Sequence, residues 1–392
     1  MMLGMPDETS PMEPHHRHTV RRVIVLSQIV LAVLTAITVV VGYRSLNGNL
    51  RDGERITHQV DKPTYEHGEP LNILVMGSDS REGEANDLEA EGATDERSDT
   101  TILIHVSADR KDAYGVSLPR DAMVDRPDCL VKGETIPGEQ DAMFNTAFSV
   151  GGAQCTIQTV EQLTGIYVDH FVTVDFNGFK DMVDAVNGVE VCIPKDVDDD
   201  QHDIHFEAGT QELTGQEALN YVRERYVLSA TGDIGRMTRQ QAFIASMVHK
   251  VMSADTLSRP DRVYAFLDAA TQSIAVDEDL DSIAALTDLA RQFRHTGLAR
   301  IKFVTVPFEE YAPDPNRLVW APEAEDLWER IRADEPLGED FSEDSLSADD
   351  PVGTTPGGSS PGTGGPESDG PSDDPSDDPS DDQERLDAGL CA

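Results

Sequence analysis

The chain has 392 residues, of which 38% are hydrophobic, so it is long enough to form one or two buried cores and still carry tails. Its formal net charge is -43 at pH 7. A nucleic acid would be repelled by such a chain unless one face were basic, so we expect no nucleic-acid partner.

The first expected element is an apolar run from Val23 to Tyr43 that contains no charged residue. About 20 residues of helix cross the hydrocarbon core of a bilayer, so this run predicts a single transmembrane anchor. Arg17, Arg21 and Arg22 precede it and favour a cytoplasmic location for residues 1–22, with the rest of the chain outside the cytoplasm. A cleaved signal peptide is the alternative, but the run is longer than a usual signal-peptide core and no Ala-x-Ala pattern follows it.

Residues 44–70 are polar and broken by Gly and Pro, which is typical of a stalk. Strand-like runs follow at 71–77, 100–107, 113–119, 170–176, 189–194 and 301–307. Amphipathic helical patterns lie between and after them, at 155–165, 178–188, 216–226, 234–254, 280–297 and 321–336. Interleaved strands and helices predict one domain over 71–336, an α/β fold of three layers (α-β-α) with a mixed central sheet.

The last segment, residues 337–392, is acidic and rich in Pro, Ser, Asp and Gly, with few branched apolar residues. A Pro-Ser-Asp-Asp unit recurs at Pro371, Pro375 and Pro379. Such a composition cannot offset the entropy of ordering, so we expect a disordered, solvated tail.

The chain has four cysteines, and an extracytoplasmic body permits disulfides. Cys129 and Cys155 bracket a loop with Gly and Pro, and we favour this pair; closing that loop would stabilise the fold by roughly 3 to 4 kcal/mol. Cys192 is expected to be buried and free, and Cys391 to lie in the tail. The other pairings among the first three cysteines, and a fully reduced protein, remain open.

Two segments each place an Asp and an Arg beside a strand-like run. They are NILVMGSDSR, with Asp79 and Arg81, and RSDTTILIHV, with Arg97 and Asp99. If the two strands lie side by side, these four side chains meet at one rim of the sheet. Two carboxylates suit Mg2+, which completes its octahedron with water and phosphate oxygens, and guanidinium groups suit phosphate.

Three further segments concentrate charge where the hydrophobic pattern pauses. They are SLPRDAM, YVRERY and GDIGRMTRQQ, which carry Arg120, Asp121, Arg223, Arg225, Asp233, Arg236, Arg239 and Gln240. Several arginines converging on one site suit a pyrophosphate, whereas a Walker motif and zinc-type spacing of His and Cys are absent from the sequence. The alternative is structural: Glu224, Arg236 and Arg239 would face water, and Asp121 would cap a turn.

The order of the motifs resembles the LytR-CpsA-Psr family of cell-wall glycopolymer transferases. The motifs are NILVMGSDSR, RSDTTILIHV, VSLPRDAMV, FNTAFSVGG, TVEQLTGIYVDHFVTVDFNGF, MVDAVNGVEV, LTGQEALNYVRER and GDIGRMTRQQ. The resemblance spans about residues 71–251 and agrees with a membrane anchor, and the composition suggests an actinobacterial source. One departure is Met143, where many members have a Lys two residues before the motif asparagine, Asn145.

The resemblance implies a membrane-bound extracytoplasmic phosphotransferase. Such an enzyme moves a glycopolymer phosphate from a polyprenyl-pyrophosphate carrier to a muramic-acid hydroxyl of peptidoglycan. The family's Mg2+-binding aspartates match Asp79 and Asp99. Its pyrophosphate-binding arginines match Arg97, Arg120, Arg223 and Arg225, and further polar positions around the head group match Asp233, Arg236 and Gln240. The lipid tunnel of the family would be lined here by residues 172–176, 179–186 and 243–248, which are as well explained as ordinary core.

We expect Arg120, Arg223 and Arg225 to stabilise charge on the transferring group, and Asp99 or Asp121 to accept the proton of the attacking hydroxyl. Two other functions stay open. One is a polyprenyl-pyrophosphate phosphatase that uses the same groups with water as acceptor. The other is a membrane-anchored regulatory protein that binds a prenyl lipid without turnover.

Overall fold

The computed structural model describes residues 14–51, 53–65, 68–78, 98–199, 204–224, 227–342, 345–351 and 379–391. The chain divides into an N-terminal unit, Met1–Gly48, and a body, Asn49–Ala392. The first unit is formed by helix α1 (Pro14–Asn49). Its stretch Arg21–Asn49 has a mean hydropathy of 2.7 over the best window and is long enough to cross a membrane, which confirms the predicted apolar helix.

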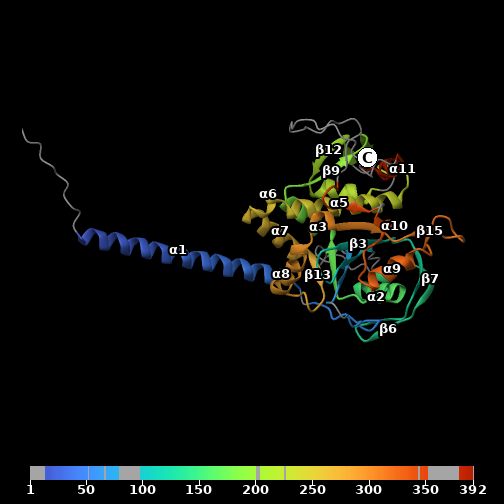
Figure 1. The fold of residues 1–392 in the computed structure, drawn as a ribbon, viewed down its shortest axis with the longest axis horizontal. Coiled ribbons are helices and arrows are strands. Elements are labelled where there is room, and N and C mark those ends of the chain that lie inside the picture. Colours follow the sequence, from blue (N-terminus) through green and yellow to red (C-terminus); the bar gives the residue numbers. More distant parts are fainter. Residues whose placement is uncertain are drawn as a thin grey trace, which may run out of the picture. The chain divides into compact units, whose positions relative to one another are not determined.

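The body is built on one mixed sheet, to which the described residues contribute seven strands in the order β13-β8-β1-β2-β3-β14-β17 (Figure 1). β1 pairs antiparallel with β2 and parallel with β8, whereas β3 pairs antiparallel with β2 and parallel with β14. The predicted mixed α/β sandwich is therefore confirmed. The strands are β1 (Leu71–Ser78), β2 (Ser98–Val106), β3 (Ala113–Leu118), β8 (His170–Asp175), β13 (Ile274–Val276), β14 (Ile301–Thr305) and β17 (Leu346–Ser347).

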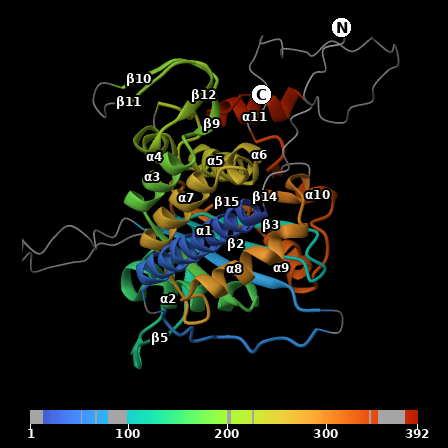
Figure 2. The same cartoon turned by 90° about the vertical axis from the view of Figure 1, so that its left-hand side faces the viewer.

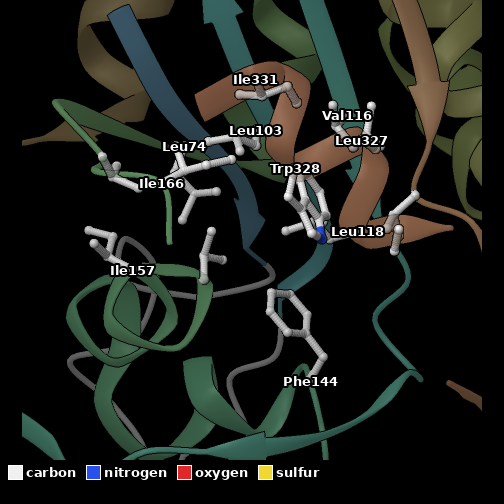
Figure 3. Close-up of a cluster of buried hydrophobic side chains, with 14 of the residues drawn as sticks. Leu74, Leu103, Val116, Leu118, Phe144, Ile157, Ile166, Leu327, Trp328 and Ile331 are labelled. Carbon is white, nitrogen blue, oxygen red and sulfur yellow. The ribbon is translucent and has the colours of Figure 1, made fainter. Parts of the chain in front are cut away.

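One face of the sheet is covered by α2 (Thr146–Thr164) and α9 (Ala324–Arg332). Leu74 and Leu103 of the sheet belong to the same buried cluster as Ile157 of α2 and Trp328 of α9, and Figure 3 shows these side chains facing one another. The sequence ends α2 where predicted, because Gly165 takes the left-handed conformation with φ 66. This face is a filled apolar core.

The opposite face is covered by α5 (Asp233–Met252), as Figures 1 and 2 show, together with α3 (Phe176–Ala185), α4 (Gly215–Arg223) and α7 (Pro260–Ser273). The start of α4 follows from a capping box, in which the Thr214 backbone N–H donates to Glu217 Oε2 at 2.9 Å. α3 and α7 approach so closely that a Cβ added at Gly178 would lie 1.7 Å from Ser273 Cβ. Only glycine fits there.

The remaining elements are short. Pairs of small strands are β4 (Met123–Arg126) with β7 (Glu139–Met143), β5 (Cys129–Val131) with β6 (Glu134–Ile136), β9 (Val189–Ile193) with β12 (Gly209–Leu213), β10 (Val197–Asp199) with β11 (Ile204–Phe206), and β15 (Phe308–Glu310) with β16 (Leu318–Trp320). Small helices are α6 (Ala254–Leu257), α8 (Ile283–Gln292), α10 (Glu339–Ser342), α11 (Pro379–Ala388) and the 3-10 turns Phe293–His295 and Leu298–Arg300.

The prediction of a stalk over residues 44–70 is wrong for residues 54–62, which lie along the body. The Thr57 N–H donates to Gln154 Oε1 at 3.0 Å, and the Gln59 N–H donates to Glu161 Oε2 at 2.6 Å. His58 Nδ1 lies 2.8 Å from Glu161 Oε1. Glu161 is fully buried, and a buried carboxylate requires such partners, so this polar segment is held on the surface by the core beneath it.

The prediction of a disordered tail over 337–392 is also wrong for the residues described there. β17 pairs with β14, and Leu390 and Cys391 are buried. Cys391 forms a disulfide with Cys192, which overturns the expectation of a free Cys192. The favoured Cys129–Cys155 disulfide is present. The low-complexity residues 352–378 lie outside the described residues.

Candidate active site

An apolar cavity of about 630 Å³ lies between the sheet and the helices α3, α4, α5 and α7. Its apolar lining includes Val174 of β8, Phe179 of α3 and Met247 of α5. These residues belong to the segments 172–176, 179–186 and 243–248, which the family resemblance implies as the lining of a lipid tunnel. The cavity is therefore where the resemblance places it, although residues 183 and 186 of the same segments are ordinary core.

One group of polar residues joins the lining of this cavity. The group comprises Thr100, Asp175, Asn220, Arg223, Glu224, Arg236 and Gln240. The Arg223 guanidinium carbon lies 4.6 Å from the centre of the Phe176 ring, a cation-π contact that supports the arginine at the end of α4. The Gln240 side chain donates to the Val222 carbonyl at 3.0 Å, which fixes α4 to α5. The cavity thus combines an apolar wall with two cations.

A chain of ion pairs connects Arg236 to Arg120. Arg236 Nη2 lies 3.3 Å from Asp233 Oδ1, and Arg120 Nη2 lies 3.5 Å from Asp233 Oδ2. Arg120 Nε also donates to Asp121 Oδ2 at 3.2 Å. The structure therefore brings four of the predicted site residues into one network. Asp233 opens α5, where a negative charge is favoured by the helix dipole.

The sequence did not single out Arg317, which completes this network. Its Nη1 lies 3.4 Å from Asp121 Oδ1, so Asp121 lies between two guanidinium groups. Arg317 directly precedes β16 and is separated from Asp121 by 196 positions. Neither spacing nor pattern links the two residues, because they are brought together by tertiary contacts, among them the pairing of Ala122 with Leu318.

The pKa of the Asp121 carboxyl is raised above its ordinary value, chiefly because burial disfavours the charged form. A hydrogen bond with Asp233 and the charge of that neighbour raise the pKa further, whereas Arg120 and Arg317 lower it without offsetting these effects. A carboxylate of raised pKa is a stronger proton acceptor than an exposed aspartate.

The loop that carries Arg120 is positioned by the segment FNTAF. The Asn145 N–H donates to the Arg120 carbonyl at 3.0 Å, and the Phe144 N–H donates to the Ala122 carbonyl at 2.8 Å. Phe144 itself is anchored in the filled core (Figure 3). The motif asparagine therefore acts here through its backbone, which fixes the Arg120 loop against the start of α2.

Three residues with a proposed surface role are buried instead. Arg236 is 2% exposed, Arg239 0% and Glu224 7%. Arg239 Nη1 donates to the Ala388 carbonyl at 2.9 Å, and its Nη2 donates to the Glu224 carbonyl. Glu224 Oε2 accepts from the Leu228 N–H at 2.9 Å. The short segment after α4 is thus held by α5 and by the returning C-terminus.

Some of the predicted site residues lie outside the described part of the chain. Asp79, Arg81, Arg97 and Arg225 lie outside the described residues, and of Asp99 only the backbone is described. β1 and β2 do lie side by side as predicted, with Ser78 opposite Ser98 and Gly77 opposite Thr100, so that Asp99 is the extra residue of a bulge. Within the ranges that the structure describes, no group of three or more His, Cys, Asp or Glu side chains could hold a metal.

Comparison with known proteins shows to which family this chain belongs. The model of the LytR_cpsA_psr family matches residues 41–332. The chain belongs to the LytR-CpsA-Psr family. This membership confirms the resemblance that the ordered motifs indicated.

Two relatives from other bacteria are similar to this chain. It is 34% identical over 265 residues to the cell wall biosynthesis protein LcpA of Corynebacterium glutamicum, which covers 60% of this chain and 49% of that protein. It is 30% identical over 272 residues to the polyisoprenyl-teichoic acid-peptidoglycan teichoic acid transferase TagV of Bacillus subtilis, covering 67% of this chain and 63% of TagV. The corynebacterial relative fits an actinobacterial source.

A solved structure supports the same conclusion about the LytR-CpsA-Psr fold. The crystal structure of B. subtilis TagV aligns with a TM-score of 0.50 at 28% identity, over 69% of this chain and 96% of that chain. The alignments with LcpA and TagV span about half to two thirds of these relatives' lengths.

Proposed function

We propose that the protein is a membrane-anchored extracytoplasmic phosphotransferase. It moves a glycopolymer phosphate from a polyprenyl-pyrophosphate carrier to a hydroxyl group of peptidoglycan. The relatives TagV of Bacillus subtilis and TagU of Enterococcus faecalis are transferases of teichoic acid to peptidoglycan, which supports this reaction class. Residues 1–22 lie in the cytoplasm in this proposal, and protease protection of the body in sealed inside-out vesicles tests that orientation.

The observation that carries the proposal is an apolar cavity lined by two arginines, of which Arg236 is buried and Arg223 is exposed. A polyprenyl chain requires an apolar enclosure, and its pyrophosphate requires cations within reach of the same enclosure. Arg223 and Arg236 line the cavity beside Phe179 and Met247. Guanidinium groups bind phosphate oxygens two at a time and keep their charge at any relevant pH.

In the proposed reaction, the acceptor hydroxyl oxygen bonds to the phosphorus that carries the glycan. The bond from this phosphorus to the bridging oxygen breaks, and polyprenyl phosphate leaves. Arg120 and Arg223 stabilise the charge that develops on the phosphoryl oxygens and on the leaving group, with Arg97 and Arg225 as further candidates for this task. Asp233, Arg236 and Gln240 keep the neighbouring side chains in place through the contacts described above.

The proton of the hydroxyl passes to Asp121 in this scheme, with Asp99 as the other candidate. Arg120 and Arg317 orient the Asp121 carboxylate, and its burial raises the pKa although the two arginines lower it. Asp121→Asn then lowers kcat by about 100-fold or more, since general bases contribute factors of this size. A kcat of Asp121→Asn equal to that of the wild type would remove this role from Asp121.

We further propose that Asp79 and Asp99 hold Mg2+. The donor set fits, because Mg2+ accepts one or two carboxylates and fills its other positions with water and phosphate oxygens. Asp79 directly follows Ser78, which pairs with Ser98 beside the Asp99 bulge. When bound, the ion would neutralise phosphate charge. Isothermal titration with Mg2+ and a non-hydrolysable donor tests this assignment: heat that is lost in Asp79→Asn supports it.

The central experiment supplies labelled lipid-linked glycan to the full chain in vesicles, with and without peptidoglycan. Label joined to peptidoglycan, together with free polyprenyl phosphate, is the expected result. Release of polymer phosphate without peptidoglycan would instead favour a phosphatase, and a stoichiometric complex without turnover would favour a lipid-binding regulator. Arg223→Ala is the inactive variant, and Arg291→Ala on exposed α8 is the matched control.

A further inference from the structure

The described body exposes few large apolar side chains, and most of them lie together. Six are more than a third exposed, and four of these fall between residues 252 and 267: Met252 at 37%, Leu257 at 61%, Tyr264 at 42% and Leu267 at 40%. The other two, Leu130 and Val150, belong to the region of β5 and α2. A concentrated apolar patch on a soluble domain marks a surface that something covers.

The patch is formed by the end of α5, by α6 and by α7. Tyr264 and Leu267 are three positions apart on α7 and therefore share one side of the helix. The charges nearby are paired: Arg262 Nη1 lies 2.5 Å from Asp255 Oδ2, and Arg259 Nη2 lies 3.4 Å from Asp261 Oδ2. Although the whole chain has a net charge of -43, this surface presents little net charge to a partner.

The point at which the chain enters the body lies on α7. Asn49, the first residue of the body, donates from Nδ2 to Asp268 Oδ1 at 2.9 Å and to Thr271 Oγ1 at 3.1 Å. The apolar membrane run ends at Tyr43, six residues earlier. Six residues span about 20 Å at most even when fully extended, so α7 is held within that distance of the end of the membrane-spanning run.

The patch is also continuous with the cavity. Phe266 lies between the exposed residues Ala265 and Leu267 on α7, and it lines the cavity together with Met247 and Val248 of α5. An apolar path therefore leads from the exposed face of α7 to the cavity wall. A lipid tail that followed this path would leave the acyl region of a bilayer without crossing water.

We propose that Met252, Leu257, Tyr264 and Leu267, here called the α6–α7 patch, form a membrane-docking surface. The body rests on the outer leaflet through this patch, and the cavity is filled from the membrane beneath it. The docking follows from the patch and from the short tether of α7. The identity of the tail that enters rests on the proposed function.

The docking is tested with the full chain in phosphatidylcholine vesicles whose acyl chains carry bromine, a contact quencher of Trp fluorescence. Leu257→Trp and Leu267→Trp are compared with Leu130→Trp, an equally apolar replacement on β5. We expect strong quenching at 257 and 267 above the background of the two native tryptophans, and none at 130. Equal quenching at all three positions would overturn the proposal. Protection of the Trp at 257 from both bromolipid and aqueous iodide would also overturn it, because such protection indicates that a protein partner or a second copy covers the patch.

A second measurement separates docking from the reaction itself. In Leu257→Asp/Leu267→Asp, turnover of a long-chain donor in the bilayer falls about tenfold, which corresponds to about 1.4 kcal/mol of lost membrane contact. In the same double variant, turnover of a short-chain, water-soluble donor stays at the wild-type value. In the control Leu130→Asp, the turnover rates of the long-chain and the short-chain donor both stay at the wild-type value. Equal losses with both donors would contradict docking. If the wild type turns over neither donor while the quenching pattern holds, the proposed function fails and the docking surface stands.

Discussion

The two faces of the main sheet are formed by the same strands but are covered in different ways. On one face, Leu74, Leu103 and Trp328 are each at most 1% exposed and fill the space beneath α2 and α9 (Figure 3). On the other, Phe179 and Met247 remain partly exposed around a cavity of about 630 Å³. The face that keeps a cavity, here called the open face, contributes less packing energy per residue, and its stability must come from other contacts.

The open face compensates with contacts that keep its helices in place. Gly178 allows α3 and α7 to touch, and Arg239 ties α5 to the carbonyls of Glu224 and Ala388. The C-terminal segment is fastened by the Cys192–Cys391 disulfide, which closes a long loop and thereby restricts the unfolded chain. The difference teaches that one face is packed throughout, whereas the other keeps a cavity and relies on contacts between its helices.

The largest expected effect comes from a matched pair of phenylalanines, one on each face. Phe171 is 2% exposed in the filled core, and Phe171→Ala should lower the free energy of unfolding by about 3 to 5 kcal/mol, because it leaves a cavity. Phe179 already lines a cavity, so Phe179→Ala should cost less than about 2 kcal/mol and raise KM for the lipid donor. Urea unfolding followed by circular dichroism measures both values. Equal costs would show that the two faces are packed alike.

The next effect concerns catalysis on the open face. Arg120→Gln should lower kcat by about 100-fold to 1000-fold, the usual loss when one charge-stabilising donor is removed. The partners of Arg120 include Asp121 and Asp233, so Gln is preferable to Ala because it retains a donor for them. Arg291→Gln on α8 serves as the control, and its kcat should equal that of the wild type. An active Arg120→Gln would remove this residue from the mechanism.

The fold was predictable where local chemistry determines structure. The capping box at Thr214 and the left-handed Gly165 fix helix ends by themselves, and the short, nearly continuous apolar run in Leu71–Ser78 predicts a buried strand. The candidate site was predictable where charged residues follow strands or open helices, as Arg120 and Asp233 do. These signals lie within a few residues of the feature they determine.

What could not be predicted depends on contacts between distant segments. Arg317 reaches Asp121 only because β16 lies beside the Arg120 loop. Leu390 and Cys391 follow a low-complexity stretch, and their burial depends on a partner, Cys192, that is 199 residues away from Cys391. Glu224 resembles half of a surface ion pair, yet it is 7% exposed, and its carbonyl accepts from Arg239 of α5, 15 residues away. Composition and periodicity do not encode such pairings.

A smaller effect tests how the helices of the open face are held together. In an exposed helix, Gly→Ala stabilises by up to about 1 kcal/mol. In Gly178→Ala we expect the opposite, a loss of about 1 to 3 kcal/mol, because the new methyl group would lie 1.7 Å from Ser273 Cβ. Gly297→Ala is the control, since no atom lies within 4 Å of its Cβ position. Thermal unfolding measures both. A stabilised Gly178→Ala would mean that α3 and α7 separate easily.

The smallest expected effect is a shift in the pH dependence of kcat/KM in a variant of Arg317. This residue directly precedes β16 and contacts Asp121. Its positive charge lowers the pKa of Asp121, whereas burial, the larger influence, raises that pKa. The base must be deprotonated to act, so kcat/KM falls on the acid side as pH drops through this pKa. Removing the charge in Arg317→Gln should raise the pKa of Asp121 further and move the acid limb to higher pH, with the plateau rate nearly unchanged.

The pH profile of Arg291→Gln provides the matched control, because the charge of Arg291 pairs with Asp288 on exposed α8. Its acid limb should coincide with that of the wild type. A limb in Arg317→Gln that stays in place would show that the titrating group is not Asp121. A limb that moves to lower pH would contradict the sign of the interaction, since loss of a neighbouring cation can only make a carboxylate easier to protonate. Either result would transfer the role of proton acceptor to Asp99 and would leave Asp121 as a residue that positions Arg120.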